Sequence, residues 1–566
     1  MWLALRSALL LGLLAAGSLG PGLLVTSRLR FSPLEKLVGA LAVSWIALYL
    51  AGFGIFLVGA PRFAAFAVSA LGAAACVRER ASLHLFARDK VTRGTLLCFF
   101  GLVAWAFLHL ALVRHYGGAW WGGDWLEHAQ RTAFFMGELP RGGPPDYAFL
   151  FAGGYVLPAR PPLQNVLAAF FCRQLDQRFE FVSLAFLVMN AAAFVPCSLL
   201  LARFARRGRA QLPLLAALLA VNPFFLENVT LTWTKLFAAF YVLAGLWFYL
   251  RSGSRAGARW LVMAGVCFAA GALVHYSAIP FVLAVAAHFA WERWRGRPGP
   301  GWASVAAAAA VAAALFMTWL GFALARWGLR PTFLSNTAVA DAAGRGMGGS
   351  ALKVALNLFY TLVPYPLRGA PLVDVVQERA AGWVRDAAFL AYQTNLLVMP
   401  GLVGGPLAVL LFWRRRRETF WRLVLPLGVV LAVASHGGLE LFGVGHVVLQ
   451  PVALLAITLL AAGLPSLPPV LRLLAAFGCA VDFGLGVLLH FHLQNEVFVV
   501  TKTAEGLVRL ADGLGLLAFA AASWWQKQSL GLVFWGDHFA SFSFAIEGLL
   551  AIGGLALAFW IARRLE

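Results

Sequence analysis

The residues that could do chemistry gather in one polar stretch at positions 120–128, where the sequence reads WWGGDWLEH. Asp124, Glu127 and His128 lie within five residues of one another, shortly after a long apolar run. A carboxylate costs roughly 2.5–3.5 kcal/mol at a bilayer centre, so acids in such a chain tend to lie where water or substrate reaches them. If the stretch is helical, Asp124 shares a face with Glu127 and His128. A carboxylate there can remove a proton from an acceptor hydroxyl, while its neighbours tune its pKa.

Two other interpretations of this stretch stay open. It could be a polar helix cap at a membrane surface, or its two carboxylates and histidine could hold a divalent cation. The sequence offers no further ligands at a suitable spacing, so we predict no metal site and no certain cofactor. The six cysteines also lack any metal-ligand spacing.

The rest of the chain consists mostly of apolar residues. Its 566 residues are 61% hydrophobic and 12% charged, with a mean hydropathy of +0.80. This composition excludes a soluble globular protein and predicts an all-α polytopic membrane protein with lipids as partners. The net charge of +21 could suggest nucleic acid. The basic clusters, however, fall in alternate loops on one side of the expected membrane, and this positive-inside pattern accounts for the charge without a nucleic-acid partner.

Apolar runs near 20 residues predict about 14–15 membrane-spanning helices. A further buried or re-entrant segment is expected around 351–366. We place the helices at about 8–26, 34–59, 61–77, 95–113, 181–202, 210–223, 235–250, 259–275, 277–291, 303–325, 390–412, 422–436, 446–463, 469–490 and 543–562.

Four segments should face the side opposite to the basic loops. The first should carry a short interfacial helix after Pro161 and Pro162, because proline favours a helix start. In the third, the glycine-rich sequence at 345–349 predicts a mobile loop. The four segments are 114–180, 222–234, 326–389 and 491–540.

The polar stretch at 123–128, with Arg131 and the run at 134–140, resembles the first external loop of the GT-C superfamily of polytopic glycosyltransferases. The likeness is to the protein mannosyltransferase and aminoarabinose-transferase type, whose loop opens with an acidic residue and continues into interfacial helices. Residues 155–165 resemble the proline-led helix of that loop. Residues 232–235 and 275–277 resemble short external turns of the same bundle.

The resemblance covers about 95–390, and the chain departs from the pattern in two ways. Three helices precede the one that leads into the acidic loop, where the family usually has one. The two acids are spaced i, i+3, whereas protein mannosyltransferases have adjacent acids, and this puts the role of Glu127 in question.

The resemblance implies a GT-C-like transmembrane helix bundle with long external loops and interfacial helices. Its N-terminal helices would occupy 1–94 and its catalytic core 95–390, including the external loop 114–180. The C-terminal helices would occupy 391–566, with the external loop 491–540. The expected location is a bacterial inner membrane, with the active site on the non-cytoplasmic side.

The implied activity is that of a hexosyltransferase or other glycosyltransferase of the cell envelope. A sugar would move from a polyprenyl-phosphate-linked donor to an acceptor by an inverting displacement, with Asp124 as base and with Glu127 and His128 beside it. The donor carries a phosphate leaving group, which cationic and hydrogen-bonding residues near the loop should stabilise. The candidates are Arg160, Lys235, His275, Tyr276 and Arg368.

Two of these candidates have simpler interpretations, and two other functions compete. Lys235 could snorkel to the membrane interface, and His275 could be a buried structural histidine. An O-antigen ligase or polymerase is also polytopic and uses external arginine and histidine. A transporter or lipid flippase would place polar residues along its helices, whereas the helices of this chain are notably apolar.

Overall fold

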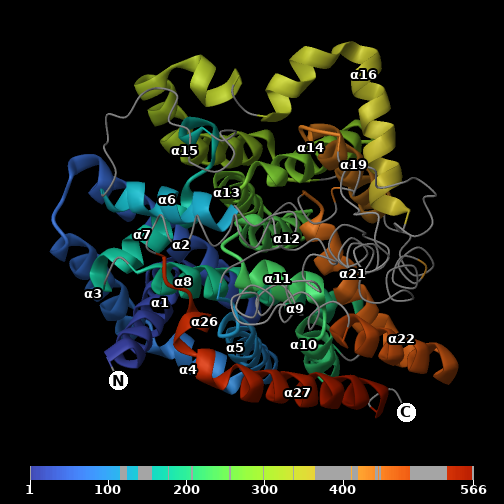
Figure 1. Ribbon diagram of the computed structural model, residues 1–566. Helices are drawn as coiled ribbons and strands as arrows, with labels where there is room; N and C mark the ends of the chain where they lie inside the picture. Colours follow the sequence, from blue (N-terminus) through green and yellow to red (C-terminus); the bar gives the residue numbers. More distant parts are fainter. Residues whose placement is uncertain are drawn as a thin grey trace.

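The computed structural model describes residues 2–114, 124–137, 156–175, 178–205, 208–253, 257–297, 299–334, 337–363, 419–439, 448–484 and 532–563, with single residues 410 and 444. These parts of the chain are helical and contain no β-strand, and their helices pack into a bundle (Figure 1). The expectation of a helical membrane protein is therefore confirmed, while a GT-C-like arrangement stays a prediction.

The first half of the chain contains long apolar helices separated by shorter ones near the predicted site. In order they are α1 (Trp2–Thr26), α2 (Pro33–Val58), α3 (Phe63–Arg78), α4 (Arg80–Arg88), α5 (Lys90–Leu110), α6 (Asp124–Met136), η1 (Leu157–Ala159), α7 (Leu163–Leu175), α8 (Phe179–Ala191), α9 (Phe194–Phe204), η2 (Gly208–Gln211), α10 (Leu212–Ala220), α11 (Pro223–Thr230), α12 (Lys235–Arg251) and α13 (Ala258–Val274).

The second half continues the bundle and ends in a long helix that packs beside α5, α10 and α22. Its helices are η3 (Tyr276–Ala278), α14 (Ile279–Trp294), α15 (Trp302–Trp327), the π-helical turn η4 (Arg330–Leu334), α16 (Thr337–Leu362), α19 (Thr419–Ser435), α21 (Gln450–Gly463), η6 (Leu464–Ser466), α22 (Pro469–Val481), α26 (Trp535–His538), η8 (Ala540–Phe542) and α27 (Ser543–Arg563).

Six spans within the described residues are long and apolar enough to cross a membrane. They include the continuous stretch formed by α8 and α9. Helices α10 and α11 would make a seventh, but they are bent by 74° at the break between them. The expected span at 390–412 lies outside the described residues. The spans are α1, α2, α5, α8 with α9, α15 and Ala540–Arg563.

Small residues let the first helices approach one another closely. A Cβ atom on Gly22 of α1 would lie 2.0 Å from the carbonyl oxygen of Ala40 in α2. A Cβ atom on Gly20 would lie 1.9 Å from the carbonyl oxygen of Gly72 in α3. Such close packing replaces the hydrophobic effect as the force that joins helices in lipid.

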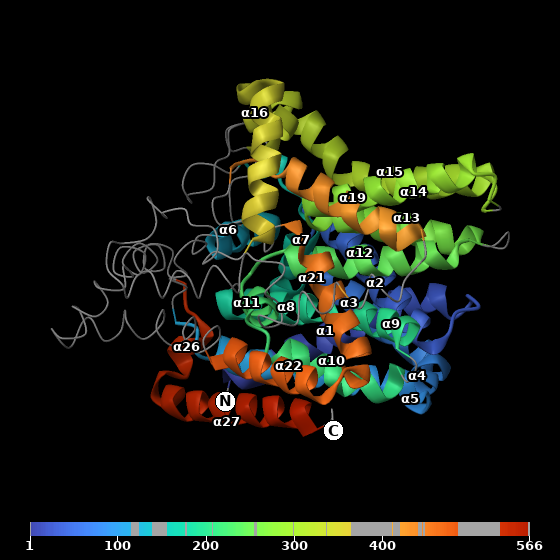
Figure 2. The ribbon, with the colours of Figure 1, turned by 90° about the vertical axis from the view of Figure 1, so that its right-hand side faces the viewer.

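The basic segments and the polar stretch lie at opposite ends of the bundle. Figure 2 shows α6, α11 and α26 at one end, and α4 with the connection between α14 and α15 at the other. Helix α4 carries Arg80 and Arg88, and the α14–α15 connection carries Arg295 and Arg297. This separation agrees with the positive-inside pattern of the sequence.

The structure differs from one expectation about the loops. Residues 345–349 were predicted to form a mobile loop because of their glycines, and this prediction is wrong, since they lie inside α16. A glycine costs about 1 kcal/mol in a helix relative to alanine. Twenty-six residues of continuous helix outweigh that local preference.

Two segments near the site are more deeply buried than the sequence indicated. Residues 223–230, expected within an external segment, form helix α11, and all eight are buried. Asn222 caps this helix by accepting a hydrogen bond from the Phe225 N–H at 3.3 Å, and Pro223 occupies its first turn. Helix α7, predicted after Pro161 and Pro162, is present, and almost all of its residues are buried against α1, α2, α3, α6 and α8.

Candidate functional site

Helix α6 carries the first candidate residues and begins at Asp124. The condition set by the sequence analysis, that this stretch is helical, is therefore met, and the register of α6 places position 124 one turn before His128. The Asp124 side chain lies outside the described structure. Glu127 and His128 are 4% and 6% exposed, and Arg131 on the next turn is 2% exposed.

Glu127 is the centre of a buried ion cluster. Its Oε1 accepts a hydrogen bond from Arg131 NH1 at 3.2 Å and lies 4.0 Å from Arg160 Nε. Burial alone would raise the pKa of Glu127, but Arg160, Arg131, His128 and Lys235 outweigh burial, so the pKa falls below its ordinary value. Glu127 is thus ionised at neutral pH and is a weak base. This geometry favours a role in holding the two arginines.

Arg131 also fixes the chain segment that carries Arg160. Its NH2 group donates to the carbonyl oxygen of Pro161, which directly follows Arg160. Burial lowers the pKa of Arg131 to about 10, with Glu127 opposing that shift, so the guanidinium stays charged at neutral pH. Arg160 follows the short helix η1, and its side chain is 20% exposed. The arginine pair therefore has one deeply buried member and one that is partly accessible.

His128 is held as a neutral imidazole with a defined tautomer. Burial lowers its pKa to about 3, although Glu127 opposes the shift. The Asn165 amide donates through Nδ2 to the His128 carbonyl at 3.1 Å and to Thr132 Oγ1 at 3.3 Å. Asn165 Oδ1 is then the acceptor that faces His128 Nδ1 at 3.2 Å, so Nδ1 carries the proton. The lone pair of the ring is then on Nε2, where it can accept a hydrogen bond, and the low pKa makes the ring a weak base.

Lys235 approaches from the start of α12. Its ammonium lies 3.8 Å from the ring centroid of Trp233, and the two residues are 9% and 0% exposed. A cation at the first position of a helix opposes the helix dipole, so helix stability does not explain the lysine at this position. Lys235 is also close enough to Glu127 to lower the pKa of that carboxyl.

His275 and Tyr276 form the turn between α13 and α14. His275 Nδ1 accepts a hydrogen bond from the Ser277 N–H at 3.1 Å, which places the proton of the neutral ring on Nε2. Burial lowers the pKa of His275 well below its ordinary value, and the nearby charges of Lys235 and Arg160 add to this shift. Burial raises the pKa of Tyr276 to about 12, so its phenol stays protonated.

The structure therefore brings together six of the predicted residues, which come from four separate segments. They are Glu127, His128, Arg160, Lys235, His275 and Tyr276. Arg368 lies outside the described residues. The sequence analysis did not select Arg131 or Asn165 as site residues. The signals for Arg131 were its place in the GT-C-like stretch and its i, i+4 spacing from Glu127, and Asn165 gave none beyond its place in the proline-led segment. The roles of all these residues stay predictions.

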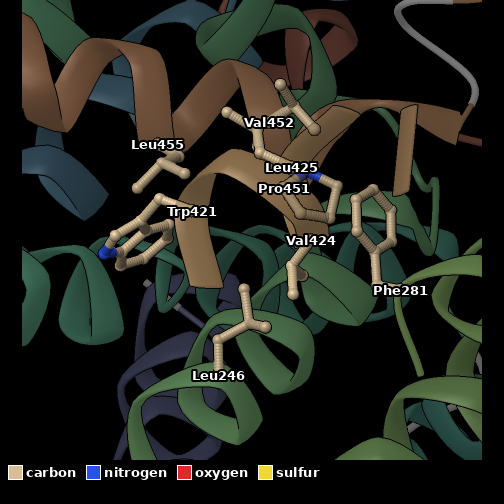
Figure 3. Close-up of a pocket in the computed structure, with 8 residues that line it drawn as sticks. All are labelled: Leu246, Phe281, Trp421, Val424, Leu425, Pro451, Val452 and Leu455. Carbon is tan, nitrogen blue, oxygen red and sulfur yellow. The ribbon is translucent and has the colours of Figure 1, made fainter. Parts of the chain in front are cut away.

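An apolar crevice lies between four helices of the bundle. Figure 3 shows its lining, which consists of hydrophobic side chains from α12, α14, α19 and α21. Helix α12 starts at Lys235, α14 follows the His275–Tyr276 turn, and α21 starts at Gln450. The lining residues are Leu246, Phe281, Trp421, Val424, Leu425, Pro451, Val452 and Leu455.

Acid should destabilise the protein through His128. Its pKa is about 3 in the folded chain against the ordinary value of 6.5, so between these values only the unfolded chain takes up the proton. The stabilising contribution of neutral His128 should be complete above its ordinary pKa of 6.5. Below that pH, the free energy of unfolding should fall by about 1.4 kcal/mol per pH unit. Thermal unfolding of wild type and His128→Gln at about pH 7 and pH 4.5 measures this. The variant should lose less stability on acidification.

The exposed His84 on α4 provides the matched control. His84→Gln should show the same acid sensitivity as the wild type, because this change leaves the buried imidazole of His128 in place. Equal acid sensitivity of the His128→Gln variant and the wild type would contradict the buried neutral imidazole.

The described residues contain no group of three or more histidine, cysteine, aspartate or glutamate side chains that could share a metal ion. The hypothesis of a divalent cation at 124–128 involves the Asp124 side chain, which lies outside those residues. The described part of the cluster is dominated by arginine and lysine, which are suited to an anion.

Comparison with known proteins gives one match within this chain. Residues 95–331 match the family model of a domain of unknown function, DUF6311. This range contains the described cluster from Glu127 to Tyr276. No curated protein and no solved structure matches the chain.

Proposed function

We propose that this protein is an integral membrane glycosyltransferase that moves a sugar from a polyprenyl-phosphate-linked donor to an acceptor. The observation that carries the proposal is the convergence of Arg131, Arg160 and Lys235 around the buried end of α6. The three cations come from separate parts of the chain, and in Figure 2 helix α6, which carries Arg131, lies at the end of the bundle opposite to its basic loops. We therefore assign this end to the non-cytoplasmic side.

The cations fit the phosphate of such a donor. Guanidinium groups and ammonium groups make strong hydrogen bonds to phosphate oxygens, and the gain is larger where water is excluded. Arg160 is the partly accessible member of the cluster and Lys235 is 9% exposed. We assign phosphate contact to these two residues, with Tyr276 and the Nε2–H of His275 as neutral donors beside them.

The start of α6, where Asp124 lies, suits removal of the proton from the acceptor hydroxyl. In an inverting displacement, the acceptor hydroxyl oxygen forms a bond to the anomeric carbon while the bond from that carbon to the phosphate oxygen breaks. The electron pair of the broken bond stays on the phosphate, and the hydroxyl proton passes to the base. We assign this base to Asp124, one turn before the neutral imidazole of His128.

The lipid part of such a donor fits a membrane protein. A polyprenyl chain is hydrocarbon, so it would stay in the bilayer beside the long apolar helices while its phosphate reaches Lys235.

The proposal predicts that Lys235→Ala weakens donor binding by about tenfold, or about 1.4 kcal/mol, the scale of one charge-assisted hydrogen bond. The measurement is binding and turnover of a labelled polyprenyl-phosphate sugar by the purified full-length protein in detergent. Lys36→Ala is the matched control, because Lys36 donates to Ser27 in the α1–α2 connection. Donor affinity equal to wild type in Lys235→Ala would remove this residue from the phosphate site.

A transporter or lipid flippase is the second candidate, and one observation favours it. Helices α10 and α11 form a broken span bent by 74°, and transporters often bind anions beside the ends of such discontinuous helices. Reconstitution in vesicles separates the two functions. A glycosyltransferase releases labelled sugar from the lipid, whereas a flippase moves the intact lipid across the bilayer.

A further inference from the structure

Four buried amide side chains connect helices that are far apart in the sequence. They come from α7, α8, α11 and α21, and each is at most 1% exposed. Because water is excluded there, each amide depends on hydrogen bonds to protein groups. The four residues, which we call the amide chain, are Gln164, Asn190, Asn228 and Gln450.

The amide chain converges on the turn that leads from α11 to α12. Gln164 Nε2 donates to Asn190 Oδ1 at 3.0 Å, which orients the Asn190 amide. Asn190 Nδ2 then faces three backbone carbonyl oxygens, those of Trp233 at 2.8 Å, Asn228 at 3.2 Å and Leu231 at 3.4 Å. On the other side, Gln450 Nε2 donates to Asn228 Oδ1 at 2.7 Å.

This turn needs such support because it has little regular structure of its own. Residues 231–234 connect two helices, and their carbonyl groups lie where water is excluded. Buried backbone carbonyls must find donors, and Asn190 supplies them from a neighbouring helix. The backbone position of Trp233 is therefore set by α8 as well as by its own segment.

Trp233 in turn sets the position of Lys235. The ammonium of Lys235 lies over the Trp233 ring, and the ring is fully buried. A shift of the Trp233 backbone would move the ring and, with it, the preferred place of the ammonium. The path from Asn190 to the ammonium thus has two steps, a hydrogen bond and a cation–π contact.

We propose that Asn190 is a positioning residue for Lys235, which it controls through the backbone and ring of Trp233. Asn190 touches no substrate in this scheme. Gln164 holds the Asn190 amide and Gln450 holds the Asn228 side chain, so that α7 and α21 also contribute to the geometry of the lysine. The link to ligand binding rests on the proposed function, in which Lys235 contacts a phosphate. The positioning of Lys235 by Asn190 does not depend on the proposed function.

The first test needs no substrate. An amine-reactive reagent is applied to the purified full-length protein, and the modification of Lys235 is followed by mass spectrometry. Asn190→Leu should raise the rate at Lys235 several-fold, because the lysine leaves its buried place over the ring, while Lys36 stays at its wild-type rate. An unchanged rate at Lys235 in a folded Asn190→Leu variant would overturn the proposal.

Two further variants control for general loosening of the structure and for failure of Asn190→Leu to fold. Gln174→Leu removes another buried amide, which donates to Phe170 O on its own helix, and should leave the Lys235 rate unchanged. A rise in this control equal to that of Asn190→Leu would reduce the effect to general loosening and overturn the proposal. If Asn190→Leu does not fold, Asn190→Asp keeps the shape and the acceptor oxygen used by Gln164 but loses the amide donors. Asn190→Asp should also raise the modification rate of Lys235.

The second test is a double-mutant cycle on binding, with polyprenyl phosphate as the probe and the neutral polyprenol as its control. Asn190→Leu should weaken binding of the phosphate by about the same factor as Lys235→Ala, and the double variant should bind no more weakly than Lys235→Ala alone. Additive losses would contradict positioning through Lys235. If the wild type does not distinguish the phosphate from the neutral lipid, the proposed function fails, and the labelling experiment still decides the role of Asn190.

Discussion

Asp124→Asn should reduce sugar transfer by about 10²–10⁴-fold, the usual contribution of a general base. The asparagine keeps the size of the side chain but cannot take the hydroxyl proton at neutral pH. Expression and donor binding should stay close to wild type, because Arg160 and Lys235 are unchanged. The measurement is single-turnover release of labelled sugar from the lipid donor, with donor affinity determined separately on the same preparation.

Asp89→Asn is the matched control for this prediction. Asp89 caps the start of α5, where its Oδ2 accepts from the Thr92 N–H at 2.8 Å. Asparagine is also a good capping residue, so this variant should transfer sugar at the wild-type rate. Wild-type turnover in Asp124→Asn would remove Asp124 as the base.

Glu127→Gln should destabilise the folded protein by up to about 3–5 kcal/mol, the usual cost of removing one partner of a buried ion pair. Arg131 is 2% exposed and would keep its charge with the neutral amide beside it. Arg160 would also lose the carboxylate that lies 4.0 Å from its Nε. Thermal unfolding in detergent, followed by helical circular dichroism, gives the change in stability. Donor binding should fall with it, since both arginines lose their common anchor.

The ion pair between Glu292 and Arg297 provides a comparison at the opposite end of the bundle. Its N–O distance is 2.8 Å, and the Arg297 side chain is 53% exposed. Solvent-exposed pairs contribute about 0.2–1 kcal/mol, so Glu292→Gln should have a small effect. Equal losses of stability in the two variants would mean that burial of the Glu127 cluster adds nothing to its strength.

The positions of the helices could be predicted because a membrane span is a local property of the chain. A run of apolar residues near 20 long satisfies its own backbone hydrogen bonds, so its length and composition suffice to locate it. The span expected at 303–325 corresponds to α15, which is one of the six candidate spans. A helix is also present at 235–250, where it forms α12, although α12 is not among those spans. The prediction of a loop at 345–349 was wrong because it considered the low helix propensity of these glycines without the rest of α16.

The candidate site could be predicted only in part. The sequence puts Asp124 on one face with Glu127 and His128 if the stretch is helical, and α6 shows that it is helical. Whether Glu127 acts as a base or as an anchor depends on Arg160, which is more than thirty residues away in sequence. No local pattern indicates that contact.

The sequence by itself therefore determined that this protein is a helical membrane protein, where most of its helices lie, and which polar residues could do chemistry. The tertiary structure decided which of these residues meet. Gln450 and Asn228 are separated by 222 positions yet share a hydrogen bond of 2.7 Å, and Lys235 faces the acidic helix from a different segment. The physical reason is the range of the forces involved. Helix formation in lipid is decided within a few turns, whereas the meeting of side chains depends on how every helix between them packs.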